Sequence, residues 1–127
     1  MTNPTEHIRR WHDELVAIRR DLHAHPELGF EERRTARVVS EHLAALGIEH
    51  ATEVGKTGIV AVVRGRSTAS GRSVGLRADM DALPMQEDNA FAHRSRYDGR
   101  MHGCGHDGHT TMLLAAARYL AETRAFD

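Results

Sequence analysis

The sequence predicts a protein of the α/β class. Apolar residues recur at helical spacing in two segments near the amino terminus, residues 4–23 and 36–47, and again over residues 106–120. Between them lie two short runs rich in β-branched or apolar residues, residues 57–65 and 73–78, which are typical of strands. The expected order of elements is therefore helix, helix, strands, loop and helix.

Each of the two amino-terminal helices is expected to place one apolar stripe against the core. The stripe of the first consists of Ile8, Trp11, Leu15, Ile18 and Leu22. That of the second consists of Ala36, Val39, Leu43 and Leu46. Pro26 ends the first pattern, and Gly47 is well placed for a left-handed cap at the end of the second.

The middle of the chain is predicted to hold the strands. Residues 57–65 are bounded by glycines and predict a buried strand, and residues 48–54 predict another strand before it. Residues 73–78 predict a third strand, which runs directly into Asp79-Met80-Asp81. Residues 85–100 are polar and are expected to form an irregular loop. Because so few strands make a thin sheet, we expect the front part of a larger domain.

Composition limits the classes of function. The length of 127 residues suits one domain. The balance of 17 basic and 18 acidic side chains argues against a nucleic-acid partner. No apolar run approaches the roughly 20 residues of a membrane span, and no signal-peptide core is expected. The single cysteine, Cys104, cannot form an internal disulfide, which fits a reducing cytoplasm.

Two aspartates follow the strand predicted at residues 73–78. Asp79 and Asp81 are two residues apart, so on an extended backbone their carboxylates point to the same side. Ligand-binding groups of α/β proteins lie outside the carboxyl ends of strands, which favours a shared cation or proton here. A solvated acidic turn is the alternative interpretation.

A glycine-rich segment, residues 101–109, carries the strongest candidates for metal binding. Cys104 and His106 stand two residues apart, and the glycines around them let the backbone turn so that their side chains converge. Asp107 is a candidate to orient an imidazole, and His109 follows one helical turn after His106. We prefer a catalytic metal site that is completed by residues elsewhere.

Three other interpretations of this segment stay open. A cysteine nucleophile with a histidine base uses the same residue types, although such partners seldom lie two residues apart in sequence. A closed structural zinc site needs four ligands, and the available set is His102, Cys104, His106 and His109. The third interpretation is a glycine-rich turn with incidental histidines.

Four motifs follow one another along the chain: Arg20–Glu32, Lys56–Val60, Arg77–Pro84 and Met101–His109. Together they resemble the amino-terminal part of the M20 metallopeptidase family. The similarity is to the amidohydrolase branch, which includes hippurate hydrolases, indole-3-acetyl-amino-acid hydrolases and N-acetyl-diaminopimelate deacetylases. Residues 1–127 are accordingly expected to be the amino-terminal part of a metal-binding catalytic domain.

The resemblance implies part of a zinc-peptidase-like, three-layer α/β/α domain that holds two divalent metal ions, Mn, Zn, Co or Ni. Cys104 and His106 would be metal ligands, and Asp81 would support the metal centre. Asp79 stands where other branches of the family have a ligating histidine. The roles of Asp79, Asp107 and His109 stay open between ligands and residues that support the ligands.

The activity implied is metal-dependent hydrolysis of the amide bond of small N-acyl or N-aroyl amino acids, in the cytoplasm and without a nucleic-acid or membrane partner. The family's general base (a glutamate of a Glu-Glu pair), its other ligands and its dimerisation domain are expected outside residues 1–127. The Glu31-Glu32 pair belongs to the opening motif, which is expected to shape the domain. Homo-oligomers are expected of the full-length form. The alternative is a non-catalytic or weakly metal-binding chain.

Overall fold

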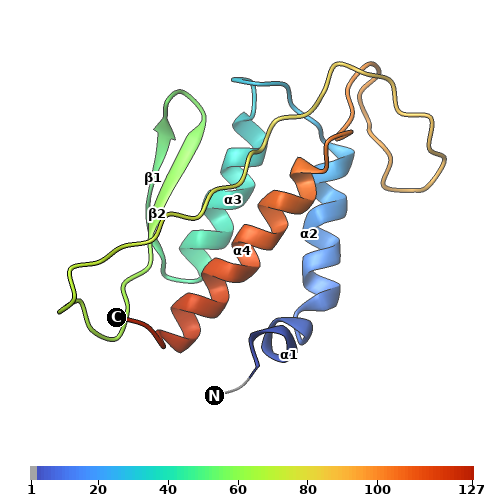
Figure 1. Ribbon diagram of the computed structural model, residues 1–127. Coiled ribbons are helices and arrows are strands. Elements are labelled where there is room, and N and C mark those ends of the chain that lie inside the picture. The colour runs from blue at the N-terminus through green and yellow to red at the C-terminus, as the bar shows by residue number, and fades with distance from the viewer. Residues whose placement is uncertain (1–2) are drawn as a thin grey trace.

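The computed structural model describes residues 3–127, in which helices and strands are mixed as predicted (Figure 1). The elements in order are α1 (Pro4–Arg9), α2 (His12–Ala24), α3 (Arg33–Ala45), β1 (Glu49–Val54), β2 (Gly58–Val62) and α4 (His106–Thr123). The predicted α/β class is confirmed, and so are the helix that starts at His106 and the irregular loop of residues 85–100.

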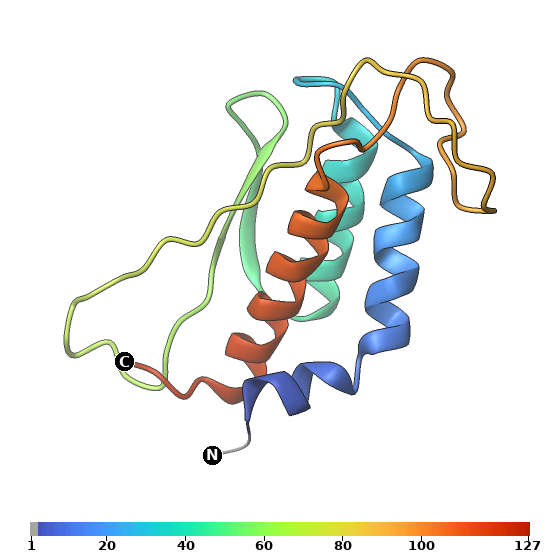
Figure 2. The same cartoon turned by 45° about the vertical axis from the view of Figure 1, so that its right-hand side comes forward.

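The long helices form one layer beside the strands. Helix α4 packs against α1, α2 and α3, and α3 packs against both strands (Figures 1 and 2). The core lies between α3, α4 and the start of β1, and its buried members are Val39, Leu43, Ile48 and Leu114. Because α4 contacts every other helix, the position of its first turn depends on the whole layer.

The amino-terminal segment forms two helices, so the prediction of one helix over residues 4–23 is wrong. The break falls at Trp11, which precedes α2 and is buried. Its indole meets the ring of His7 edge to face, and the guanidinium of Arg118 lies 4.0 Å from the indole centroid. Burial of this large ring against α4 compensates for the break, which spacing alone does not reveal.

The strands β1 and β2 form an antiparallel hairpin in which Glu49 pairs with Val62 and Ala51 with Val60. The strand predicted over residues 48–54 is confirmed as β1. The prediction that β2 is buried is wrong, because Val60 and Val62 are 53% and 45% exposed. Helix α3 covers one side of the hairpin, and the other side is open within residues 3–127.

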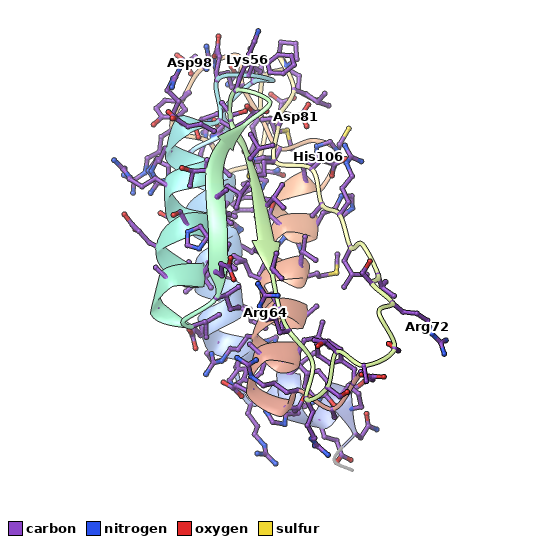
Figure 3. The ribbon with its side chains drawn as sticks, turned by 90° about the vertical axis from the view of Figure 1, so that its left-hand side faces the viewer. Lys56, Arg64, Arg72, Asp81, Asp98 and His106 are labelled. Atoms are coloured by element: carbon purple, nitrogen blue, oxygen red, sulfur yellow. The ribbon has the colours of Figure 1, made fainter. Side chains whose placement is uncertain are left out.

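Residues 73–78 do not form a strand, which corrects the prediction made for them. The segment is extended, but it pairs with no strand among the described residues, and Val74 and Leu76 are exposed. A strand exists only with a hydrogen-bonded neighbour, whereas β-branched composition reports local preference alone. The segment nevertheless carries the chain back from Arg72 to Asp81, which lies close to His106 (Figure 3).

The opening motif shapes the domain, as expected. The carboxylate of Glu27 accepts hydrogen bonds from the backbone N–H groups of Arg34 (3.0 Å) and Thr35 (2.6 Å), and thereby caps α3. The backbone carbonyl of Glu27 also accepts from the N–H of Ala82, 2.8 Å away. Gly47, beyond α3, has the predicted left-handed conformation, with φ of 67°.

Over residues 3–127, none of the helices combines the length and the apolar character that a membrane crossing requires.

Candidate metal centre

The residues predicted to carry the chemistry come from two segments that meet at one end of the molecule. The first is the extended chain that ends in Asp79-Met80-Asp81, and the second is the first turn of α4. Figure 3 shows Asp81 and His106 together at the end that also holds Lys56, away from Arg64 and Arg72.

Asp81 holds the imidazole of His106 from one side. Nδ1 of His106 lies 2.9 Å from Oδ1 of Asp81 and 2.8 Å from the backbone carbonyl oxygen of Asp81. Since both partners are acceptors, Nδ1 carries the proton. The other ring nitrogen, Nε2, is then available as an electron-pair donor, and it lies 3.4 Å from Oδ2 of Asp79.

Asp79 connects His106 to His109. Nδ1 of His109 donates to Oδ1 of Asp79 over 3.0 Å, and the hydroxyl of Thr110 donates to the backbone carbonyl of Asp79, also over 3.0 Å. The hydrogen bond from His109 holds the pKa of Asp79 below its usual range, against the opposing effect of burial. Asp79 is therefore a carboxylate near neutral pH.

These side chains fit a divalent metal ion. One ligand atom from each of Asp79, His106 and His109 lies within 4.8 Å of the other two, among the residues that the structure describes. Carboxylate oxygen and imidazole nitrogen are donors that zinc, manganese and related ions accept. Asp81 fits as well, because a ligating histidine normally donates its second ring nitrogen to a carboxylate or carbonyl.

Cys104 precedes the helix start by two residues. Its thiol is free and exposed, and it is not a member of the group formed by Asp79, His106 and His109. Gly105, between Cys104 and His106, has φ of 80°, so the chain turns sharply before α4 begins. The assignment of Cys104 as a metal ligand stays a prediction.

Comparison with known proteins places this geometry in a family. The sequence profile of Peptidase family M20/M25/M40 matches residues 75–127, a range that contains every residue of the centre described above. The chain is 50% identical over 108 residues to the hippurate hydrolase of Campylobacter jejuni. It is 47% identical over 123 residues to an N-acyl-L-amino acid amidohydrolase of Geobacillus stearothermophilus. These matches relate the chain to the M20 peptidase family.

A solved M20 structure shares the fold. The YxeP protein of Bacillus subtilis, described as a dinuclear metal-binding peptidase from the M20 family, superposes with a TM-score of 0.80 at 39% identity. The match covers 92% of this chain and 32% of YxeP. The matches to the two relatives above cover 85% and 94% of this chain but only 28% and 33% of those proteins. The chain thus spans about a third of the length of its M20 relatives.

Asp107 of this chain does contact a histidine, but that histidine is His23 of the opening motif and not one of the candidate ligands. Nδ1 of His23 lies 2.9 Å from Oδ2 of Asp107, and Nε2 of His23 lies 3.1 Å from both carboxylate oxygens of Glu87. Burial raises the pKa of Glu87, but hydrogen bonds from Asn89, Ser95 and His23 outweigh it and lower the pKa below its usual value. The sequence does not single out Glu87, because only burial distinguishes it from other loop carboxylates.

His102 of the same motif is buried, with 5% of its surface exposed. Neither ring nitrogen has a hydrogen-bond partner within residues 3–127, and burial lowers the pKa of the imidazole despite the opposing charge of Asp107. Among the described residues, His102 and Cys104 do not join His106 and His109 in one group. The geometry therefore gives no support to a closed zinc site made of these four side chains.

Proposed function

We propose that this chain supplies part of a dinuclear metal centre in an M20 enzyme that hydrolyses the amide bond of N-acyl or N-aroyl amino acids. The observation that carries the proposal is the imidazole of His106, which is held by Asp81 through Nδ1 and turned toward Asp79 through Nε2. The names of the relatives support the substrate class, because hippurate and N-acyl-L-amino acids are N-acyl amino acids. The description of YxeP as a dinuclear metal-binding peptidase supports a pair of metal ions.

The residues of the chain have distinct roles in this proposal. His106 and Cys104 are ligands, and Asp81 keeps the His106 ring in the tautomer that offers Nε2 to the metal. Asp79 and His109 stand close enough to add a carboxylate oxygen and a second imidazole nitrogen. A bound Mn, Zn, Co or Ni ion lowers the pKa of water and polarises an acyl carbonyl.

The general base is proposed to lie outside residues 1–127. The Glu31-Glu32 pair does not supply it, because both carboxylates are engaged elsewhere. Glu31 pairs with Arg100 at 2.8 Å, and Glu32 is buried and accepts a hydrogen bond from the Thr57 hydroxyl at 2.7 Å. We therefore expect the 127-residue chain by itself to bind a metal ion without turning over substrate.

The test uses the complete natural polypeptide that contains this sequence. Hydrolysis of hippurate and of N-acetyl amino acids is measured after addition of manganese, cobalt or zinc. Cys104→Ser and His106→Ala are each expected to abolish more than nine-tenths of the activity, whereas Asp98→Asn, a change at an exposed loop carboxylate, leaves it unchanged. Unchanged turnover in both ligand variants would contradict the proposal.

A second readout does not depend on turnover. Cobalt(II) bound through Cys104 is expected to show a thiolate charge-transfer band, which Cys104→Ser removes while His106→Ala weakens binding as a whole. Absence of the band from the cobalt-loaded complete protein would contradict the role of Cys104. A small-molecule substrate, a cytoplasmic location and a homo-oligomeric complete protein belong to the same proposal, and the single free cysteine supports the location.

A further inference from the structure

His23, near the end of α2, lies between two carboxylates that are almost completely buried. The side chains of Glu87 and Asp107 are 0% and 1% exposed, and each lies within 3.1 Å of one nitrogen of the ring. A buried carboxylate without partners is costly, so the ring stabilises both, together with Asn89 and Ser95 at Glu87 and with Arg19 at Asp107. His23 is thus hydrogen-bonded to Asp107 in the first turn of α4, which lies 84 residues later in the sequence.

Asp107 is the residue through which this contact reaches the candidate metal centre. It directly follows His106, and the first turn of α4 has no side-chain cap among the described residues, because Gly105 occupies the cap position. The turn is instead held from α2. Nδ1 of His23 binds Oδ2 of Asp107, and Nε of Arg19 lies 3.5 Å from the same oxygen.

The Arg19 side chain of α2 lies against α4 at this point. A methyl group at Gly108 would lie 3.3 Å from the guanidinium carbon of Arg19, one residue after Asp107. A shift of the Asp107 carboxylate would therefore move the first turn of α4. His106 and His109 stand on that turn, and the carboxylates that they face belong to a different segment.

We propose that His23 is a positioning residue of the metal centre. Its Nδ1–H holds Asp107 and thereby sets where His106 and His109 stand relative to Asp79 and Asp81. This inference rests on the proposed metal binding and adds to it a residue of the opening motif that touches neither metal nor substrate. If the contact only stabilised the packing of α2 on α4, its loss would lower the free energy of unfolding without changing the metal affinity of the folded chain.

Two isosteric substitutions separate these possibilities. The side-chain amide nitrogen of His23→Asn takes the place of Nδ1 and keeps the bond to Asp107. That of His23→Gln takes the place of Nε2 and keeps the bond to Glu87. Each substitution removes one of the two hydrogen bonds of the ring, so a merely structural role predicts that the two variants have similar metal affinity. The positioning role predicts that only His23→Gln disturbs the metal centre.

The measurement is the dissociation constant of cobalt(II) for the folded chain, obtained from visible absorbance. We expect His23→Gln to weaken binding about tenfold and His23→Asn to remain within twofold of the parent. His50→Gln is the matched control. The imidazole of His50 is also bonded on both nitrogens, to the Ser40 hydroxyl and to the carbonyl of Ile48, each at 2.8 Å, but it lies on β1. The His50→Gln variant should therefore bind cobalt with the same dissociation constant as the parent.

Equal affinity of the two His23 variants would overturn the inference. If His23→Gln does not fold, Asp107→Ala takes its place, because it removes the same hydrogen bond from the other partner; cobalt binding about tenfold weaker is then expected, and parent-like affinity would overturn the inference. Failure of the parent chain to bind cobalt would count against the proposed function instead. The inference is then decided by the ring nitrogen resonances of His106 without metal, which should shift in His23→Gln and not in His23→Asn.

Discussion

Asp81 binds one nitrogen of His106 twice, through its carboxylate at 2.9 Å and through its own backbone carbonyl at 2.8 Å. The two acceptors fix both the tautomer and the plane of the imidazole before any metal arrives. Because Asp81 ends the extended segment and His106 begins α4, this contact joins the two parts of the candidate centre.

The orientation of His106 is expected to determine metal affinity. Asp81→Ala removes the carboxylate that holds Nδ1, and we expect the affinity of the chain for zinc or cobalt to fall about 10- to 100-fold. Competition with a coloured chelator measures this loss. Asp98→Ala removes an exposed carboxylate of the 85–100 loop and should leave the affinity within twofold of the parent. Similar losses in both variants would show that only net charge matters.

Gly105 is expected to be required for its backbone conformation. Its φ of 80° lies in the left-handed region, where a β-carbon costs about 1 kcal/mol, so Gly105→Ala should lower the free energy of unfolding by about that amount. Urea denaturation of the chain measures the change. Gly29→Ala is the control, because Gly29 has no positive φ and a methyl group there would meet open space. A null effect at Gly105 would mean that the turn readjusts.

The ion pair between Asp21 and Arg34 is expected to stabilise the chain in a pH-dependent way. Hydrogen bonds from Arg34, at 2.8 and 3.0 Å, hold the pKa of Asp21 below its usual value. The contribution is therefore complete above the unfolded-state pKa of about 3.9 and is lost as the pH falls through the lower pKa of the folded chain. Asp21 is 41% exposed, so solvent screening limits the effect to less than about 1 kcal/mol.

The measurement compares Asp21→Asn with the parent by urea denaturation at several pH values. The variant should be less stable at pH 7, and the two should converge near pH 2. Glu41→Gln serves as the control, because its partner Arg37 is 3.8 Å away and both side chains are mostly exposed. A difference between Asp21→Asn and the parent that persists unchanged in acid would contradict the role of charge.

Leu22 is expected to contribute strongly to stability. Its side chain is completely buried in α2, and Leu22→Ala should cost about 2–5 kcal/mol because the cavity that remains cannot be refilled. Leu76→Ala truncates the same residue type where it is 58% exposed, and should change the free energy of unfolding by less than about 0.5 kcal/mol. Thermal unfolding monitored by circular dichroism distinguishes the two. Comparable losses at both positions would mean that residues 73–78 are packed in solution.

The amino-acid sequence by itself determined the elements whose signals are local. The apolar spacing around Val39 and Leu43 predicted α3, and Gly47 predicted its left-handed end. The spacing of His106 and His109 predicted both imidazoles on one helix, and the position of Asp79 and Asp81 after residues 73–78 made them candidates to share a cation or a proton. Apolar periodicity and backbone preference depend on residues that are close in the sequence, so they can be identified from the sequence alone.

Only the tertiary structure decided which partners these elements find. Residues 73–78 have the composition of a strand but pair with no strand in the described chain. The helix predicted over residues 4–23 is interrupted at Trp11, whose indole packs against Arg118 of α4. His23 contacts Glu87 and Asp107, which lie 64 and 84 residues away in the sequence. Burial makes the hydrogen bonds of these carboxylates, including those to His23, important for stability, and burial is a property of the packed layer of helices that no short segment contains.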